Sequence, residues 1–83
     1  MKPSRSEVFA ELSGYLRDAF EVPAEKIALE ARLFEDLDLD SIDAVDLVVK
    51  LQDYTGKKIQ VAEFKSVRTV GDVVERVYAQ LQG

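Results

Sequence analysis

A single serine, Ser41, lies in the most acidic part of the sequence. Residues 36–47 read DLDLDSIDAVDL, so five aspartates surround this one hydroxyl. Three kinds of chemistry fit such a setting. The aspartates could bind calcium, they could stabilise the start of a helix beside an incidental serine, or the serine could be modified by another protein. The three alternatives predict different roles for the same residues.

The calcium alternative depends on the spacing of the first three aspartates. Asp36, Asp38 and Asp40 match the opening of an EF-hand loop, D-x-D-x-D. The next position of that loop requires glycine for its sharp turn, and here it is Ser41. The last position requires a bidentate glutamate, and here it is Leu47. Because both departures affect the coordination geometry itself, we expect no metal site.

The second alternative treats the same aspartates as helix-stabilising residues. Asp40 suits the N-cap position, and Asp43 in the first turn complements the positive end of the helix dipole. The chain has no histidine and no Ser-x-x-Lys sequence, so no base is available to activate Ser41. We therefore expect no catalytic residue and no enzyme activity. The serine could still accept a group that a separate enzyme transfers to it.

The overall composition describes one small acidic domain over residues 1–83. The chain is 47% hydrophobic, has a net charge of −5 and contains no cysteine, so neither disulfides nor thiolate metal sites are expected. Residues 35–53 carry seven acids against one lysine, and residues 54–68 carry four basic residues against one glutamate. This distribution favours docking to basic protein surfaces over binding to nucleic acid. No apolar run approaches the roughly 20 residues of a membrane span, so a cytoplasmic protein without an integral membrane segment is expected.

The hydrophobic pattern predicts an all-α fold, a small four-helix bundle with three main helices and one short helix. The first helix should begin near Ser4, where S-R-S-E matches a capping box, and end before Pro23. The second is predicted over residues 41–54 and the last over residues 69–81, with a short turn of helix at 61–64. The long loop over residues 21–40 is predicted to fold back over the core because it carries several large apolar residues, namely Ile27, Leu29, Leu33, Phe34 and Leu37.

The predicted second helix has two apolar faces. One has the spacing of a core stripe: Ala44, Leu47, Val48 and Leu51. The other points mostly away from the core, beside a charged stripe. Either the long loop covers this second strip, or a partner docks on it, with apolar contacts for affinity and aspartates for orientation. We favour partner docking, through Ile42, Asp43, Val45, Asp46 and Val49.

The motif at residues 40–47, D-S-I-x-x-x-D-L, resembles the modification site of acyl carrier proteins, and the resemblance extends to chain length, acidity and the order of the helices. It implies the acyl carrier fold, with 4′-phosphopantetheine attached covalently to Ser41 and Asp40 as the helix cap beside it. It also implies a carrier that holds growing acyl or polyketide intermediates as thioesters for partner enzymes of fatty-acid or polyketide biosynthesis.

Two residues depart from the family pattern. Ile42 replaces the usual leucine, which is a conservative change, and Asp38 stands where the family often has glycine. Asp38 changes the loop before the site without removing the acceptor. The segments T-G-K-K-I at 55–59 and F-K-S-V-R-T-V at 64–70 look most like freestanding, type II carriers of aryl-polyene pigment clusters.

The resemblance also implies a set of partners: a phosphopantetheinyl transferase, a ketosynthase, a ketoreductase, a dehydratase and acyl-loading enzymes. The free carrier is expected to be a monomer. Its helices are expected to shelter the acyl chain, with a lining around Phe34, Val48, Val67 and Val74. The alternative is a non-enzymatic helical adaptor whose serine stays unmodified.

Overall fold

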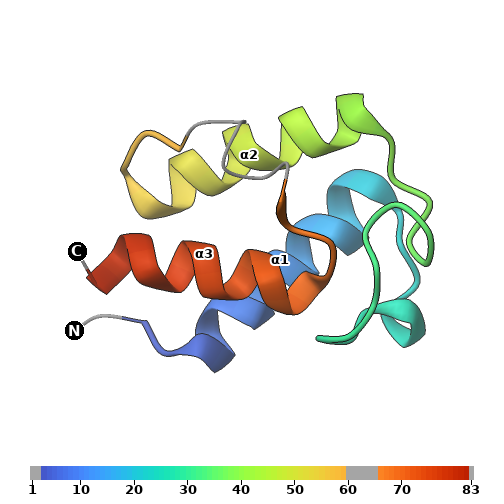
Figure 1. Cartoon of the computed structure of the whole chain (residues 1–83), viewed down its shortest axis with the longest axis horizontal. Coiled ribbons are helices and arrows are strands. Elements are labelled where there is room, and N and C mark those ends of the chain that lie inside the picture. The colour runs from blue at the N-terminus through green and yellow to red at the C-terminus, as the bar shows by residue number, and fades with distance from the viewer. Residues whose placement is uncertain (1–2, 60–65, 83) are drawn as a thin grey trace.

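A computed structural model, which describes residues 3–59 and 66–82, shows the expected all-α fold. Three helices make up the frame: α1 (Arg5–Phe20), α2 (Ser41–Thr55) and α3 (Val70–Gln82) (Figure 1). The loop between α1 and α2 also contains one turn of 3-10 helix, η1 (Ala24–Lys26), that the sequence did not predict. The short helix predicted at 61–64 lies outside the described residues.

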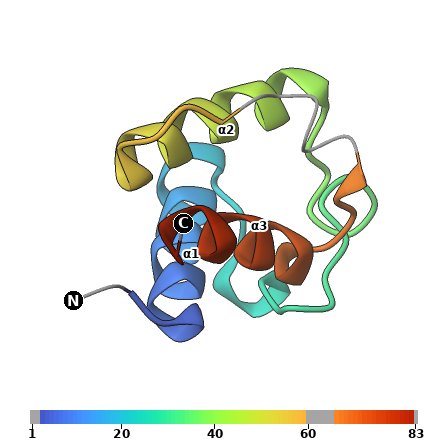
Figure 2. The same ribbon diagram turned by 60° about the vertical axis from the view of Figure 1, so that its left-hand side comes forward.

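The three helices enclose a single apolar core. The helix α1 packs against α3, and α2 lies above both of them in the two views (Figures 1 and 2). Each helix contributes residues three or four positions apart, the spacing that places side chains on one face. The most deeply buried large side chains are Val8, Leu12, Leu16, Leu47, Val48, Leu51, Val70, Val73 and Val77. No helix among the described residues is long and apolar enough to cross a membrane.

The predicted cap of α3 is complete, whereas at α1 only the Ser4 half of the predicted capping box is present. The Ser4 hydroxyl accepts a hydrogen bond from the Glu7 N–H at 3.3 Å. At α3 the bonds are reciprocal, because Asp72 N donates to Thr69 Oγ1 and Thr69 N donates to Asp72 Oδ2, both at 3.2 Å. The Arg68 N–H also donates to this carboxylate, at 3.0 Å. These backbone donors lower the pKa of Asp72, so the carboxylate is charged at neutral pH.

The long loop is fixed to the start of α3 by backbone pairing. Three N–H···O bonds of 2.8–2.9 Å join the two segments: Leu33 N to Arg68 O, Val70 N to Ala31 O, and Gly71 N to Leu29 O. An isolated antiparallel bridge between Arg32 and Thr69 lies within this pairing. Because each such bond contributes about 1 kcal/mol, the loop is part of the folded frame.

The expectation that all the large apolar residues of the loop fold over the core is only partly right. Leu33 and Leu37 are buried, but Phe34 is 46% and Leu29 is 53% exposed. Phe34 lies in the turn that follows the bridge, where the N–H groups of Asp36 and Leu37 both donate to Arg32 O. This turn leaves the Phe34 side chain about half exposed, while Ala31 and Leu33 are buried.

Alanine substitutions at two glycines test how closely the loop approaches α3. A Cβ on Gly71 would lie 3.0 Å from the Leu29 carbonyl oxygen, whereas a Cβ on Gly14 would meet nothing within 4 Å. Alanine is favoured over glycine in a helix by about 1 kcal/mol. Gly14→Ala should therefore raise the free energy of unfolding by up to about 1 kcal/mol, and Gly71→Ala should leave it unchanged or lower it. Urea denaturation measures both, and an equal gain at the two positions would contradict the close approach.

The replacement Asp72→Asn tests the α3 cap through its pH dependence. Since the pKa of Asp72 is lowered below its usual value of 3.8, the charged carboxylate stabilises the folded state above about pH 4, and this contribution is lost as the pH falls through the lowered value. The wild-type protein should exceed the variant in free energy of unfolding at about pH 6. This difference in free energy of unfolding should become smaller as the pH falls from about 4 to about 2. Urea denaturation at several pH values measures the difference, and a constant difference would contradict a stabilising role of the charged Asp72 carboxylate.

Candidate functional site

Ser41 is the first residue of α2, and its side chain is exposed. It follows directly on Asp40, which has extended backbone geometry and serves as the N-cap, as predicted. The hydroxyl therefore lies where the chain enters the helix, at the end where backbone N–H groups are free of intrahelical partners. This end of the molecule is reached from solvent without moving any helix.

The two aspartates on either side of Ser41 form a complete capping box. Asp43 N donates to Asp40 Oδ1 at 2.9 Å, and Asp40 N donates to Asp43 Oδ2 at 3.2 Å. The sequence predicted that Asp43 complements the helix dipole and contributes to docking, but not that it makes this return bond. The three-residue spacing that defines capping boxes was a usable signal for it, with aspartate in place of the usual glutamate.

The residue two positions before the cap has an uncommon backbone conformation. Asp38 has a φ of +58°, in the left-handed region. Glycine adopts this region freely, and aspartate is one of the few other residues that tolerates it. The left-handed turn allows Leu37 and Leu39 on its two sides both to be buried. The position where the family often has glycine is therefore one that requires a positive φ in this chain.

The aspartates around Ser41 do not converge on a common point. Across residues 3–59 and 66–82, no group of three or more aspartate, glutamate, histidine or cysteine side chains is arranged to hold a metal ion. The carboxylate of Asp40 is engaged in the capping box. That of Asp36 accepts bonds from the backbone and side chain of Arg32, which lower its pKa. The calcium alternative therefore finds no support in this geometry.

The second apolar strip of α2 is exposed. Ile42 is 77%, Val45 is 45% and Val49 is 48% exposed, and the loop does not cover them. The core stripe on the other face is buried at Leu47, Val48 and Leu51, as expected. Asp46 is also exposed, next to the strip. An apolar strip of this kind with acidic neighbours, starting one residue after an exposed serine, suits a docking face.

The four residues expected to line an acyl shelter lie in different surroundings. Val48 and Val67 are buried, whereas Phe34 is 46% exposed. Val74 lines a cavity between α1 and α3 together with Phe9 and Leu29, and no residue of α2 takes part in that wall.

Comparisons with known proteins agree with this geometry. The family described as "Phosphopantetheine attachment site" matches residues 10–77. The chain is 47% identical to "Acyl carrier protein 2" of Ralstonia nicotianae over 78 residues, which cover 94% of this chain and 96% of the relative. It is 39% identical to an "Acyl carrier protein" of Saccharopolyspora erythraea over 71 residues, or 86% of this chain and 75% of the relative.

The fold also matches a solved structure. The crystal structure of the acyl carrier protein of Thermotoga maritima superposes with a TM-score of 0.81 at 27% identity, covering 94% of this chain and 91% of that one. The phosphopantetheine match indicates a 4′-phosphopantetheine prosthetic group on a serine. The chain belongs to the acyl carrier proteins, which carry acyl intermediates on that arm and are not themselves catalysts.

Proposed function

We propose that Ser41 is the residue that carries the 4′-phosphopantetheine. The family match covers three serines: Ser13, Ser41 and Ser66. The Ser13 hydroxyl oxygen is buried, and the Ser66 hydroxyl accepts a bond from Arg76 at 3.1 Å. Ser41 combines exposure with a place at the start of a capped helix. That placement is the observation that carries the proposal.

The start of α2 fits a phosphodiester. The N–H groups of Ser41 and Ile42 have no intrahelical partner, while that of Asp43 is occupied by Asp40. Free N–H groups and the positive end of the helix dipole favour an anion there. The carboxylates nearby oppose it, but all of them lie at the surface, where water and salt screen the repulsion. Asp40 and Asp43 hold the helix end in place beneath the acceptor oxygen.

The chain leaves the chemistry of attachment to another protein. Because the sequence has no histidine, we expect a phosphopantetheinyl transferase to supply the base that takes the Ser41 proton. The Ser41 oxygen then bonds to the phosphorus that bears pantetheine, and the diphosphate bond of coenzyme A breaks to release adenosine 3′,5′-bisphosphate. Once bound, the prosthetic group supplies a terminal thiol that holds an acyl group as a thioester, which this cysteine-free chain does not supply itself.

The exposed face of α2 is the proposed docking surface for partner enzymes. Its apolar strip contributes buried area on binding, and its aspartates orient a basic partner surface and speed the encounter. The apolar strip and the aspartates both begin within one turn of Ser41. A partner bound to this face therefore holds the arm near its own active site. The residues proposed to take part are Ile42, Asp43, Val45, Asp46 and Val49.

We further propose that this is a freestanding, type II carrier of fatty-acid or polyketide biosynthesis, and more specifically of an aryl-polyene-type pathway. The 47% identity to the Ralstonia carrier, 96% of which the match covers, supports this proposal. The segments at 55–59 and 64–70 support the aryl-polyene subclass through their resemblance. The proposed partners are the transferase, ketosynthase, ketoreductase, dehydratase and acyl-loading enzymes, acting on a monomeric carrier.

Intact mass spectrometry tests the attachment residue. The unmodified protein, incubated with coenzyme A, magnesium and a promiscuous phosphopantetheinyl transferase, should gain the mass of one phosphopantetheine. Ser41→Ala should gain nothing, whereas Ser66→Ala should gain as much as the wild type. No gain by an initially unmodified wild-type protein would contradict the proposal and favour an adaptor with an unmodified serine.

Charge reversal at Asp46 tests the docking face. Asp46→Lys should lower kcat/KM for the transferase and for a cognate ketosynthase about tenfold, because it replaces an attraction of about 1 kcal/mol with repulsion. Asp18→Lys, the same charge change at an exposed site on α1, is the matched control and should stay close to wild type. Thermal denaturation should show both variants folded. Unchanged kcat/KM for Asp46→Lys with every cognate partner would contradict this docking face.

A further inference from the structure

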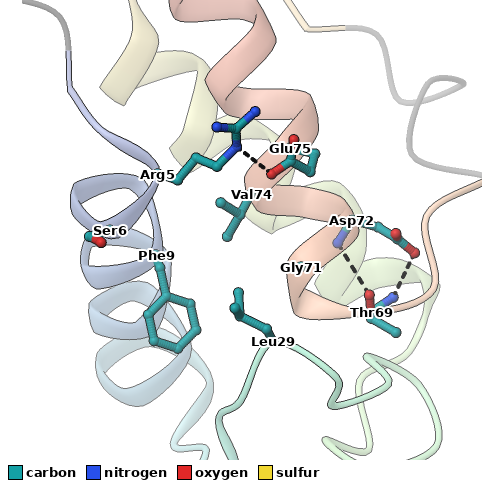
Figure 3. Close-up of a pocket in the computed structure, with 9 residues that line it drawn as sticks. All are labelled: Arg5, Ser6, Phe9, Leu29, Thr69, Gly71, Asp72, Val74 and Glu75. Atoms are coloured by element: carbon teal, nitrogen blue, oxygen red, sulfur yellow. Dashed lines mark hydrogen bonds and ion pairs between the residues drawn. The ribbon is translucent and has the colours of Figure 1, made fainter.

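Phe34 is a large apolar residue at the surface that has no part in the site described above. Its side chain is 46% exposed. The other exposed large hydrophobic residues in the described part of the chain form the apolar strip of α2 or, at Leu29, line the cavity between α1 and α3 (Figure 3). Phe34 belongs neither to α2 nor to that cavity wall. Its aromatic ring is therefore open to contact with another molecule.

Hydrogen bonds hold the backbone on both sides of Phe34. Before it, Leu33 N donates to the start of α3 at 2.9 Å. After it, the N–H groups of Asp36 and Leu37 both donate to Arg32 O, at 2.9 and 3.1 Å. An exposed side chain on a backbone that is already fixed loses little further freedom when a partner binds it. Phe34 therefore has the rigidity of a contact residue.

The turn that holds Phe34 lies close to Ser41. Leu39 N donates to Leu33 O at 3.1 Å, so the segments before Phe34 and before Ser41 are in direct backbone contact. With the fixed spacing of neighbouring Cα atoms, this bond keeps the Cα atoms of Phe34 and Ser41 within about 16 Å of each other. Both side chains are exposed.

The surface between these two residues carries negative charge that no cation of the chain offsets. The nearest cation in sequence, Arg32, forms ion pairs with Glu35 at 2.6 Å and with Asp36 at 3.3 Å. Asp38 and Asp40 are exposed, and neither takes part in the ion pairs found among residues 3–59 and 66–82. A partner that covers this surface needs basic groups around an apolar recess.

The proposed attachment at Ser41 identifies a partner that must cover this surface. A phosphopantetheinyl transferase has to bring the Ser41 oxygen itself to its active site, whereas an enzyme acting on the loaded carrier reaches the acyl group through the arm. The contact surface of the transferase is therefore centred on Ser41. A specific interface buries about 800 Å² of each protein, equivalent to a disc of about 16 Å in radius. Phe34 lies within that area.

We propose that Phe34 is an anchor residue for the phosphopantetheinyl transferase. Its ring enters an apolar recess beside the transferase active site, and Asp38 and Asp40 pair with basic groups around the recess. Phe34 determines docking and specificity and does not touch the reacting atoms. The docking surface for this partner thus extends from α2 onto the loop. The inference rests on the proposed attachment at Ser41.

Loading kinetics at varied carrier concentration test this role, with the promiscuous transferase as the probe. Phe34→Ser should raise the KM for the carrier about tenfold with little change in kcat, because an apolar contact is lost while Ser41 stays in place. Phe34→Leu keeps an apolar side chain and should retain most of the wild-type kcat/KM. Leu29→Ser is the matched control, since Leu29 is 53% exposed on the same loop but directed toward Phe9 and Val74 (Figure 3). It should behave like the wild type.

Competition separates docking from the placement of Ser41. The Ser41→Ala variant cannot be loaded at that residue, so it inhibits loading of the wild-type carrier through docking alone. Adding Phe34→Ser to this variant should raise its inhibition constant about tenfold. Adding Leu29→Ser instead should leave the constant unchanged. Thermal denaturation of each variant shows whether it is folded.

The outcomes distinguish this inference from the assignment of Ser41. If the wild type is loaded at Ser41 but Phe34→Ser leaves the KM and the inhibition constant unchanged, the anchor role of Phe34 is overturned and the attachment residue stands. Equal effects of the Phe34 and Leu29 changes, or a loss confined to kcat, also overturn the anchor role. Absence of loading in the wild type overturns the assignment of Ser41, and the inference with it.

Discussion

The pairing of the loop with the start of α3 is the constraint on which the other parts of this structure depend. Leu33 takes part in two backbone bonds, since its N–H donates to Arg68 O and its carbonyl accepts from Leu39 N. Leu39 immediately precedes the cap of α2. A continuous hydrogen-bonded path therefore runs from α3 through the loop to the residue before Asp40, and the start of α2 is fixed relative to the core although it lies at the surface.

The same pairing decides which apolar residues are buried. Ala31 and Leu33 are buried where the loop pairs with α3, whereas Leu29 before them and Phe34 in the turn after them are exposed. The pairing also brings Gly71 so close to the loop that a larger residue would press on the Leu29 carbonyl. The cavity beside Leu29 and the fixed position of Ser41 therefore both depend on this pairing. A change that weakened the three backbone bonds would disturb the structure at both places.

Much of the frame could be predicted because its signals are local. These signals are the caps at Ser4, Asp40 and Thr69 and the helical spacing of the valines in α3, and each acts within one or two turns. They predicted helix ends close to the observed ones. The exposed strip of α2 also followed from the helical wheel. The pairing of residues 29–33 with 68–71 could not be predicted, because it joins backbone atoms far apart in sequence and needs no particular side chain. For that reason the exposure of Leu29 and Phe34 was missed, as was the cavity that Leu29 helps to line.

Under the proposed assignment, the point of attachment and the docking strip share one rigid helix. Ser41 and Val49 are eight residues apart in α2, which corresponds to about 12 Å along a helix axis. The helix therefore fixes the distance between the docking strip and the point where the arm is attached. Insertions in the surrounding loops do not change this distance, so enzymes of very different shape can use one carrier if their docking site and active site are separated to match it.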